Sequence, residues 1–258
     1  MGISEERNQI SESIAGRVAV IVGAAGGIGR ATAARLAAAG CRLALVDLDG
    51  AALDGVVAEL GLSEAALSCV ADVTDRAQVD SIAAEVEKRF GGVDILVNAA
   101  GINTKQRTLA DMSPAQWEQV IAVNLNGAFH CTQAFLAVMR KGGGGAVVNI
   151  ASTAAELVSS GAGTHYCAAK RALLSLTESI NMEQGQHGIR ACAISPGEVD
   201  TPLMDQRPEL PSEERRATML RPGDIAEAVY YVVTRPARVV VSEVVMWPSA
   251  QISGIHVV

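Results

Sequence analysis

From Arg17 onward, short apolar runs rich in β-branched residues alternate with longer, Ala-rich segments of helical period. This alternation is typical of repeated β-α-β units, which place parallel strands in one sheet. The runs are continuously apolar, as expected for strands that helices cover on both faces. Seven strands are predicted, at Val18–Val22, Leu43–Val46, Leu67–Ala71, Ile95–Val97, Ala146–Ile150, Ile189–Ile194 and Val244–Met246. Helices are predicted between them, near residues 28–39, 50–60, 75–90, 114–140, 165–185 and 223–233.

Length and composition fit one α/β domain over residues 17–258. The chain has 258 residues, of which 49% are hydrophobic, enough to cover a large sheet on both faces. Residues 1–16 are polar and acidic without an apolar run, and we expect a loose N-terminal extension there. Thr74 is predicted to cap the helix that follows it, and Ser113 to cap the helix that begins at Pro114.

Charge and cysteine usage exclude several classes of protein. The formal net charge is -7 and no basic run is present, which argues against nucleic-acid binding. The five cysteines are scattered and never paired as C-x-x-C, so neither a disulfide framework nor a metal site is predicted. No stretch approaches the roughly eighteen uninterrupted apolar residues of a membrane span. We therefore expect a cytoplasmic protein with a small-molecule partner.

A glycine-rich turn joins the first predicted strand to the first predicted helix. Gly23, Gly27, Ile28 and Gly29 lie in this turn, in the strand-turn-helix context of a dinucleotide site. Glycine lets the backbone approach a diphosphate, and the helix N-terminus offers free N–H groups and the positive end of the dipole. A phosphate-binding P-loop is excluded because no Gly-Lys-Ser/Thr follows. The turn predicts a Rossmann-type nucleotide site, with a purely structural turn and a methyltransferase-like nucleotide site as alternatives.

Asp47 ends the second predicted strand and narrows the choice of nucleotide. A carboxylate there can accept hydrogen bonds from the adenosine ribose hydroxyls and would repel a 2′-phosphate. No Arg or Lys stands within the glycine turn or directly after Asp47. The sequence therefore favours NAD over NADP.

Tyr166 and Lys170 are four residues apart in a predicted helix, so their side chains share one face. An ammonium group beside a phenol favours the phenolate, and we expect it to lower the tyrosine pKa. A phenol tuned in this way can exchange a proton with an alcohol or a ketone. His165 is adjacent to Tyr166, and we expect it at the rim of the site.

From Arg17 to Gln251 the chain resembles the short-chain dehydrogenases/reductases. The segments that carry the resemblance are Gly23-x-x-x-Gly27-x-Gly29, Asp72-Val73, Asn98-Ala99-Ala100-Gly101, Asn124 within Val123-Asn124-Leu125, Ser152 after Asn149-Ile150-Ala151, Tyr166-x-x-x-Lys170, and Pro196-Gly197 with Thr201. So many ordered matches are highly specific for the family.

The resemblance implies a role for each matched residue. Asp72 and Val73 would hold the adenine. Asn98 would stabilise the central sheet and, with Gly101, line the cofactor cleft. Ser152 would bind the reacting oxygen, Tyr166 would be the acid/base, and Lys170 would bind the nicotinamide ribose. Asn124 would support a water chain. Residues that would fix the carboxamide are Pro196, Gly197, Val199 and Thr201. For Asn98 and Asn124, the satisfaction of buried backbone groups remains an alternative, and Ser152 or Thr201 could simply cap a turn.

Two positions depart from the family pattern. Val22 stands where the family usually has Thr, which removes a local hydroxyl bond. Ser152 is one residue farther from Tyr166 than the usual spacing, so Thr153 competes with it for the oxygen-binding role. The segment from Arg235 to Pro248 resembles a branch that includes 3-hydroxy-acid and serine dehydrogenases, yet that branch often prefers NADP.

The resemblance also implies an architecture and an assembly. We expect one doubly wound Rossmann domain, a seven-stranded parallel sheet of order 3-2-1-4-5-6-7 with helices on both faces. The segment Pro202–Arg221 would form a lid, and the long helices 114–140 and 165–185 would pair in a homodimer or homotetramer. The expected activity is hydride transfer between a secondary alcohol or ketone and NAD. An NAD(H)-binding regulator without turnover is the alternative.

Overall fold

The computed structural model describes residues 11–62, 66–159 and 161–251 of the chain. Its seven parallel strands form one sheet of order β3-β2-β1-β4-β5-β6-β7, which confirms the predicted topology. The strands are β1 (Val18–Val22), β2 (Arg42–Asp47), β3 (Ala66–Val70), β4 (Ile95–Asn98), β5 (Gly145–Ile150), β6 (Ile189–Pro196) and β7 (Glu243–Met246). In the register at the centre of the sheet, Val20 of β1 lies between Ala44 of β2 and Leu96 of β4.

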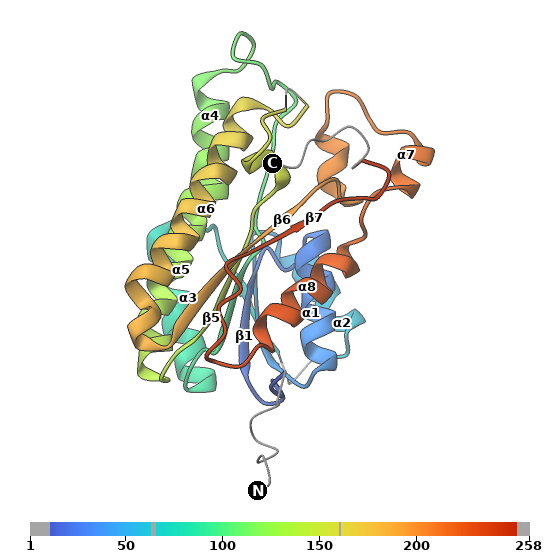
Figure 1. Ribbon diagram of the computed structural model, residues 1–258. Helices are drawn as coiled ribbons and strands as arrows, with labels where there is room; N and C mark the ends of the chain where they lie inside the picture. The colour runs from blue at the N-terminus through green and yellow to red at the C-terminus, as the bar shows by residue number, and fades with distance from the viewer. Residues whose placement is uncertain (1–10, 63–65, 160, 252–258) are drawn as a thin grey trace, which may run out of the picture.

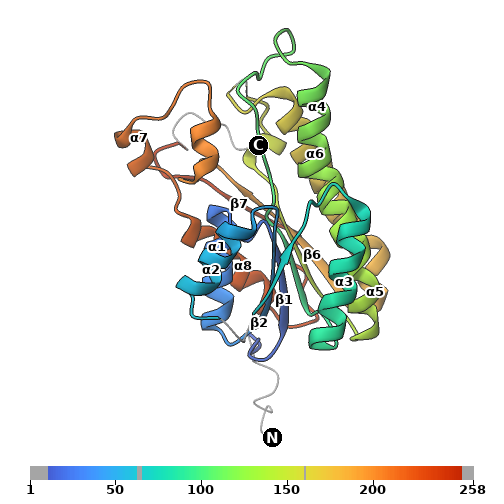
Figure 2. The same ribbon diagram turned by 180° about the vertical axis from the view of Figure 1, so that it is seen from behind.

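Helices cover both faces of the sheet (Figures 1 and 2). On one face lie α1 (Gly27–Ala38), α2 (Gly50–Glu59) and α8 (Pro222–Val233); on the other lie α3 (Arg76–Phe90), α4 (Pro114–Ile121), α5 (Ala128–Lys141) and α6 (Thr164–Gln184). Among the described residues, no helix is long and apolar enough to cross a membrane.

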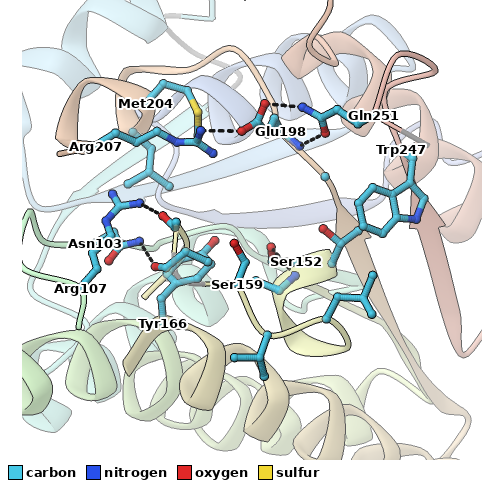
Figure 3. Close-up of a pocket in the computed structure, with 18 of the residues that line it drawn as sticks. Asn103, Arg107, Ser152, Ser159, Tyr166, Glu198, Met204, Arg207, Trp247 and Gln251 are labelled. Carbon is cyan, nitrogen blue, oxygen red and sulfur yellow. Dashed lines mark hydrogen bonds and ion pairs between the residues drawn. The ribbon is translucent and has the colours of Figure 1, made fainter. Parts of the chain in front are cut away.

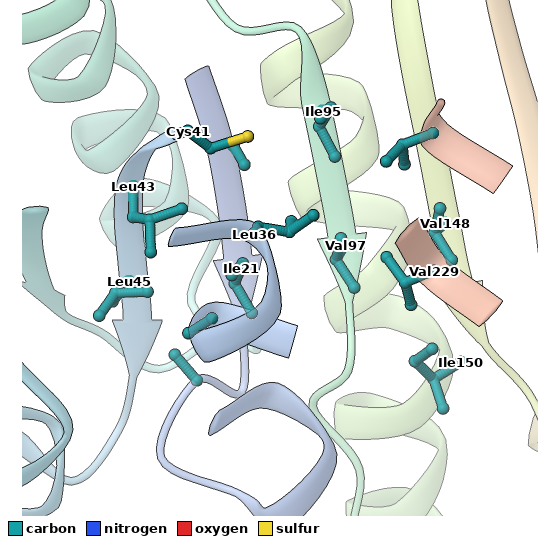
Figure 4. Close-up of a cluster of buried hydrophobic side chains, with 14 of the residues drawn as sticks. Ile21, Leu36, Cys41, Leu43, Leu45, Ile95, Val97, Val148, Ile150 and Val229 are labelled. Atoms are coloured by element: carbon teal, nitrogen blue, oxygen red, sulfur yellow. The ribbon is translucent and has the colours of Figure 1, made fainter. Parts of the chain in front are cut away.

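Among the described residues, two large hydrophobic clusters fill the spaces between the sheet and its helices, and a third, smaller one lies around Leu173 of α6. Alternate strand residues point to opposite faces, so Ile21 joins one cluster while Val20 and Val22 join the other. Figure 4 shows the first cluster, in which Leu36 of α1 and Val229 of α8 pack onto the strands. Burial on both faces explains why the strands are continuously apolar in sequence.

The predicted strand boundaries agree with the structure to within about two residues, but three local predictions need correction. Asp75, not Thr74, caps α3, since its carboxylate accepts from the N–H groups of Ala77 and Gln78. The helix predicted over 114–140 is interrupted by a π-helical turn, η2 (Ala122–Gly127). A short helix that was not predicted, α7 (Glu213–Ala217), lies within the predicted lid.

The residues just before β1 are not a loose extension. Ile14 is 2% exposed and belongs to the first cluster. The backbone N–H of Glu12 donates to Thr234 O at 2.7 Å, and its carboxylate pairs with Arg17. The chain therefore joins the domain by Glu12, earlier than expected, while residues 1–10 lie outside the described residues.

Candidate active site

The glycine turn, Gly23–Gly29, connects β1 to α1 and admits no larger residue at its key positions. Gly23 has a φ of +79°, and a Cβ there would lie 2.6 Å from the Ala100 nitrogen. A Cβ on Gly29 would overlap the carbonyl oxygen of Gly23. The backbone is thus folded tightly on itself, and the first N–H groups of α1 lack partners within the helix.

Thr201 lies directly across from the glycine turn. A Cβ on Gly27 would lie 2.8 Å from Thr201 Cγ2. Gly27, Ile28, Gly101 and Thr201 help line a cavity of about 220 Å³. The side chain of Thr201 does not cap the short 3-10 helix η5 (Pro202–Gln206) that follows it. With Gly29, which also lines it, the structure brings five predicted cofactor residues into one cavity, and its close-packed glycine cradle and helix N-terminus fit a dinucleotide diphosphate.

Asp47 lies against the glycine turn at the end of β2. Its Oδ2 accepts from the backbone N–H of Ala25 at 2.9 Å, and its Oδ1 accepts from the N–H of Asp49 at 3.3 Å. These bonds fix the carboxylate at the end of the strand, where the sequence analysis expects an adenosine ribose. The ribose contact itself stays a prediction.

Asp72 and Val73 follow β3, as the adenine-binding prediction requires. Asp72 accepts from both the N–H and the hydroxyl of Thr74, which closes a small turn. Val73 is buried and packs against Gly127, where an added Cβ would lie 2.6 Å from Val73 Cγ2. These contacts give both residues a structural role, and their contact with adenine stays a prediction.

Asn98, at the end of β4, ties the centre of the sheet together. Its Nδ2 donates to Asn149 Oδ1 at 2.8 Å on β5 and to Thr132 Oγ1 at 3.2 Å on α5. Its buried Oδ1 has no hydrogen-bond partner within the described part of the chain. The sheet-stabilising role follows from these contacts, while a cofactor contact stays a prediction.

Asn124 lies in the π-helical turn η2 and clamps the loop after β4. Its Oδ1 accepts from Ile102 N at 2.8 Å and its Nδ2 donates to Ile102 O at 2.9 Å. A Cβ on Gly101 would contact both Asn124 Oδ1 and Lys170 Nζ, at 3.5 and 3.6 Å. Asn124 therefore satisfies buried backbone groups and also borders the lysine. The water chain expected for it stays a prediction.

Lys170 is buried under the site on α6. It is 3% exposed, and its Nζ donates to Ile150 O at 2.7 Å, at the end of β5. The Nζ lies 5.6 Å from the centre of the Tyr166 ring, as the four-residue spacing predicts. Burial lowers the pKa of Lys170 to about 8, so it is mostly protonated at neutral pH.

Tyr166 does not show the lowered pKa expected from its lysine neighbour. Burial raises its pKa, because a phenolate is poorly solvated there. A hydrogen bond with the Ser152 side chain and the charges of Arg107 and Arg207 act in the opposite direction but do not overcome burial. The expectation is wrong for this structure, in which the neutral phenol is favoured.

Ser152 lies between β5 and a one-turn 3-10 helix, η3 (Thr153–Ala155). Its Oγ accepts from the N–H of Ala154 at 3.1 Å, and its hydroxyl donates to Pro196 O at 3.5 Å. Ser152 thus caps the turn, and it also lines a second cavity together with Tyr166, whose pKa it acts to lower. Thr153 is buried and lines that second cavity too. These contacts favour Ser152 as the oxygen-binding residue, although the assignment stays a prediction.

The segment Pro196–Val199 leaves β6 beside the site. Gly197 donates its N–H to Met246 O at 2.7 Å, and a Cβ on it would lie 2.9 Å from Pro248. Val199 is buried and forms a bridge with Leu220. The segment is held from both sides, and its predicted carboxamide contact stays a prediction.

Tyr166 and Ser152 open into a second cavity, of about 380 Å³, which we call the arginine-lined cavity (Figure 3). Its apolar lining includes Leu157, Val158, Leu203, Met204 and Trp247, and its charged lining consists of Arg107, Glu198, Arg207 and Arg215. In Figure 3, Arg207 and Glu198 lie across the cavity from Tyr166 and Ser152.

The charged residues of the arginine-lined cavity were missed by sequence reasoning, apart from Arg215 as part of a charged lid. Arg107 and Arg207 stand in irregular segments with no motif around them, so no sequence signal pointed to the site. His165 was predicted at the rim, but it is fully buried, and its Nε2 lies 2.7 Å from the Thr104 hydroxyl. Burial and the nearby Arg107 lower the pKa of His165.

Comparison with known proteins agrees with this arrangement. Residues 17–211 match the sequence profile of the short chain dehydrogenase family. The levodione reductase of Leifsonia aquatica is 39% identical over 192 residues, 73% of this chain and 72% of the relative.

Two solved structures share the fold. One is the 3-ketoacyl-(acyl-carrier-protein) reductase of Brucella melitensis complexed with NADH, with a TM-score of 0.82 and 29% identity over 90% of this chain and 97% of that chain. The other is the alcohol dehydrogenase of Thermococcus sibiricus complexed with 5-hydroxy-NADP, with a TM-score of 0.80 and 32% identity over 91% of this chain and 97% of that chain.

Proposed function

This chain belongs to the short-chain dehydrogenase family, and from that premise we propose that it is an NAD-dependent oxidoreductase acting on secondary alcohols or ketones. The observation that carries the proposal is the placement of Tyr166 and Ser152. Both side chains line one cavity, Ser152 acts to lower the Tyr166 pKa, and Lys170 lies one helical turn away. Tyr166 supplies an acid/base and Ser152 supplies a second hydroxyl group, both facing the same cavity.

The cofactor would lie along the carboxyl ends of the strands, where the two cavities open. The glycine turn would hold its diphosphate, with Asp47 at the adenosine ribose and Lys170 at the nicotinamide ribose. When bound, the nicotinamide accepts or supplies the hydride. The residues of the chain hold the two reactants together and exclude water from the space between them.

Tyr166 and Ser152 would handle the proton. In the reduction direction the neutral Tyr166 phenol would donate its proton to the substrate oxygen. In the oxidation direction it would first release that proton to solvent, and the resulting tyrosinate would accept the O–H proton of the alcohol, while bound NAD would supply the hydride acceptor. The Ser152 Oγ accepts from Ala154 N–H, and its hydroxyl donates only a long bond of 3.5 Å to Pro196 O, which it would exchange for a bond to the substrate oxygen. The Lys170 ammonium would stabilise the tyrosinate formed transiently beside it.

The preference for NAD rests on Asp47. Its carboxylate is fixed by the Ala25 N–H, so a 2′-phosphate at the same place would meet a negative charge. The two solved structures described above carry NADH in one case and an NADP derivative in the other. The proposed preference for NAD therefore rests on Asp47 of this chain and not on the cofactors bound in the two solved structures.

We also propose that the protein forms a homodimer or homotetramer. Phe129 of α5 and Met182 of α6 are 43% and 85% exposed, although both are large and apolar. Pairing of these helices between subunits would cover them. A monomer by light scattering at micromolar concentration would contradict the assembly.

We further propose that the protein works in the cytoplasm. All five cysteines are free, which is consistent with a reducing compartment.

The proposal is tested by the Tyr166→Phe variant. In the wild type, a survey of secondary alcohols with NAD should reveal turnover. In the variant, kcat should fall by about 10² to 10⁴, because general acid-base catalysis is lost. NADH affinity, measured by fluorescence titration, should change little. Full activity in the variant, or NADH binding without turnover of any alcohol by the wild type, would contradict the proposal, and the second result would favour a regulator.

A further inference from the structure

The arginine-lined cavity carries an excess of positive charge. Among the described residues that line it, Arg107, Arg207 and Arg215 are cationic and only Glu198 is anionic. The protein as a whole has a formal net charge of -7. The local balance is thus opposite in sign to the global one, and it falls beside the proposed acid/base.

Glu198 forms ion pairs with two of the arginines. Its Oε1 lies 2.5 Å from Arg207 Nη1 (Figure 3). The same oxygen lies 2.7 Å from Arg215 Nη2. Burial alone would raise the pKa of Glu198, but its bonds to the two arginines outweigh burial and lower it. Glu198 is therefore ionised and neutralises one positive charge, which leaves the other two.

Arg107 has no anionic partner in the described part of the chain. It is 7% exposed, and its guanidinium donates to three backbone carbonyls, those of Thr104, Gly161 and Gln206. A guanidinium has five N–H groups, so two remain after these bonds. A buried cation without a counter-charge is costly, and an anion in the cavity would offset that cost.

Arg207 also reaches the cavity. Its Nε is buried, without a hydrogen-bond partner among the described residues, and does not face the cavity, but its side chain is 21% exposed and lines the cavity. A planar carboxylate matches the donor geometry of a guanidinium. Arg107 and Arg207 come from segments 100 residues apart, and the fold brings both to the cavity that Tyr166 lines.

We propose that Arg207 and Arg107 bind a carboxylate of the substrate, so that the enzyme acts on small hydroxy acids or the corresponding oxo acids. The hydroxyl-bearing carbon would lie at Tyr166 and Ser152, and apolar carbons would contact Leu157. This inference rests on the proposed function and specifies its substrate class.

The test compares secondary hydroxy acids of three to six carbons with their methyl esters, which keep the reacting alcohol but lack the charge. With the wild type and NAD, kcat/KM for an acid should exceed that for its ester by about 10- to 100-fold, the effect of a hydrogen bond to a charged group. In Arg207→Gln the ratio should fall below about threefold. Arg207 is chosen because Arg107 holds three backbone segments and its loss could unfold the loop.

Arg216→Gln is the matched control. Arg216 lies in α7 and pairs with Asp200 and Asp205, and it is not among the cavity-lining residues. The control should keep the wild-type preference for acids. A wild-type enzyme that uses esters as well as acids would overturn the inference. So would an Arg207→Gln variant that loses both activities equally, because that result indicates only a structural role.

A binding experiment separates this inference from the proposed function. Calorimetry on the NADH-loaded protein would compare butanoate with butanamide, neither of which can be oxidised at a hydroxyl. Tighter binding of butanoate, weakened by Arg207→Gln, would support the carboxylate site even if no alcohol were turned over. Equal binding of the two probes would overturn the site whatever the enzyme does to alcohols.

Discussion

The glycine turn and the arginine-lined cavity lie at the same edge of the sheet but are built from different parts of the chain. The glycine turn consists of backbone packed against backbone, such that Gly23 and Gly29 have no room for a Cβ. The arginine-lined cavity is bounded by long side chains such as Arg207 and Trp247. A site built from backbone atoms depends little on side-chain identity and suits a cofactor that stays the same. In a site lined by side chains, an amino-acid substitution can change which substrate binds.

The two regions also differ in their sequence separation. The glycine turn forms within seven consecutive residues, between a strand and the helix that follows it. The arginine-lined cavity gathers residues from the loop after β4, the loop after β5 and the segment after β6. We therefore expect substitutions in the glycine turn to affect folding and cofactor binding together. Substitutions in the cavity should affect turnover and substrate choice.

The largest effect is expected from Gly29→Ala. The added methyl group would overlap Gly23 O, and neither backbone segment can move without opening the turn. Thermal or urea unfolding should show a loss of about 3 kcal/mol or more, and NADH binding should become undetectable. Gly223→Ala, within α8, is the control because nothing lies within 4 Å of its added Cβ. If both variants bind NADH normally, backbone packing does not define the cofactor site.

The second largest effect is expected from Ser152→Ala, compared with Thr153→Ala. Loss of one donor to the reacting oxygen lowers kcat by about 10² to 10³, and we expect this for Ser152→Ala. Thr153→Ala should stay within about tenfold of the wild type, because the Ser152 side chain, and not that of Thr153, acts on the Tyr166 pKa. Steady-state rates at saturating NAD measure both. An inactive Thr153→Ala beside an active Ser152→Ala would show that the family spacing is the better guide.

The smallest effect concerns coenzyme choice at Asp47. The wild type should prefer NAD over NADP by at least about tenfold in kcat/KM, equivalent to about 1.4 kcal/mol. Asp47→Asn should narrow this gap, because it removes the charge but keeps an oxygen that can accept from Ala25 N–H. Parallel assays with the two coenzymes measure the ratio. Equal wild-type rates with NAD and NADP would contradict the role of Asp47.

Much of the fold and part of the site could be predicted because their signals are local. Strand positions follow from apolar runs, and the strand order follows from a family resemblance carried by ordered motifs. Tyr166 and Lys170 share a helix face because of the helical period, and the structure places the ammonium near the ring. The π-helical turn at Asn124 left no such signal, because its pattern reads as ordinary helix.

The sequence by itself determined the strand positions, the glycine turn and the pairing of Tyr166 with Lys170, since each depends on residues close together in the chain. Only the tertiary structure decided the pKa direction of Tyr166, the burial of His165 and the convergence of Arg107 with Arg207. Solvation and charge at a buried group depend on every segment packed around it, and those segments meet only after the chain has folded.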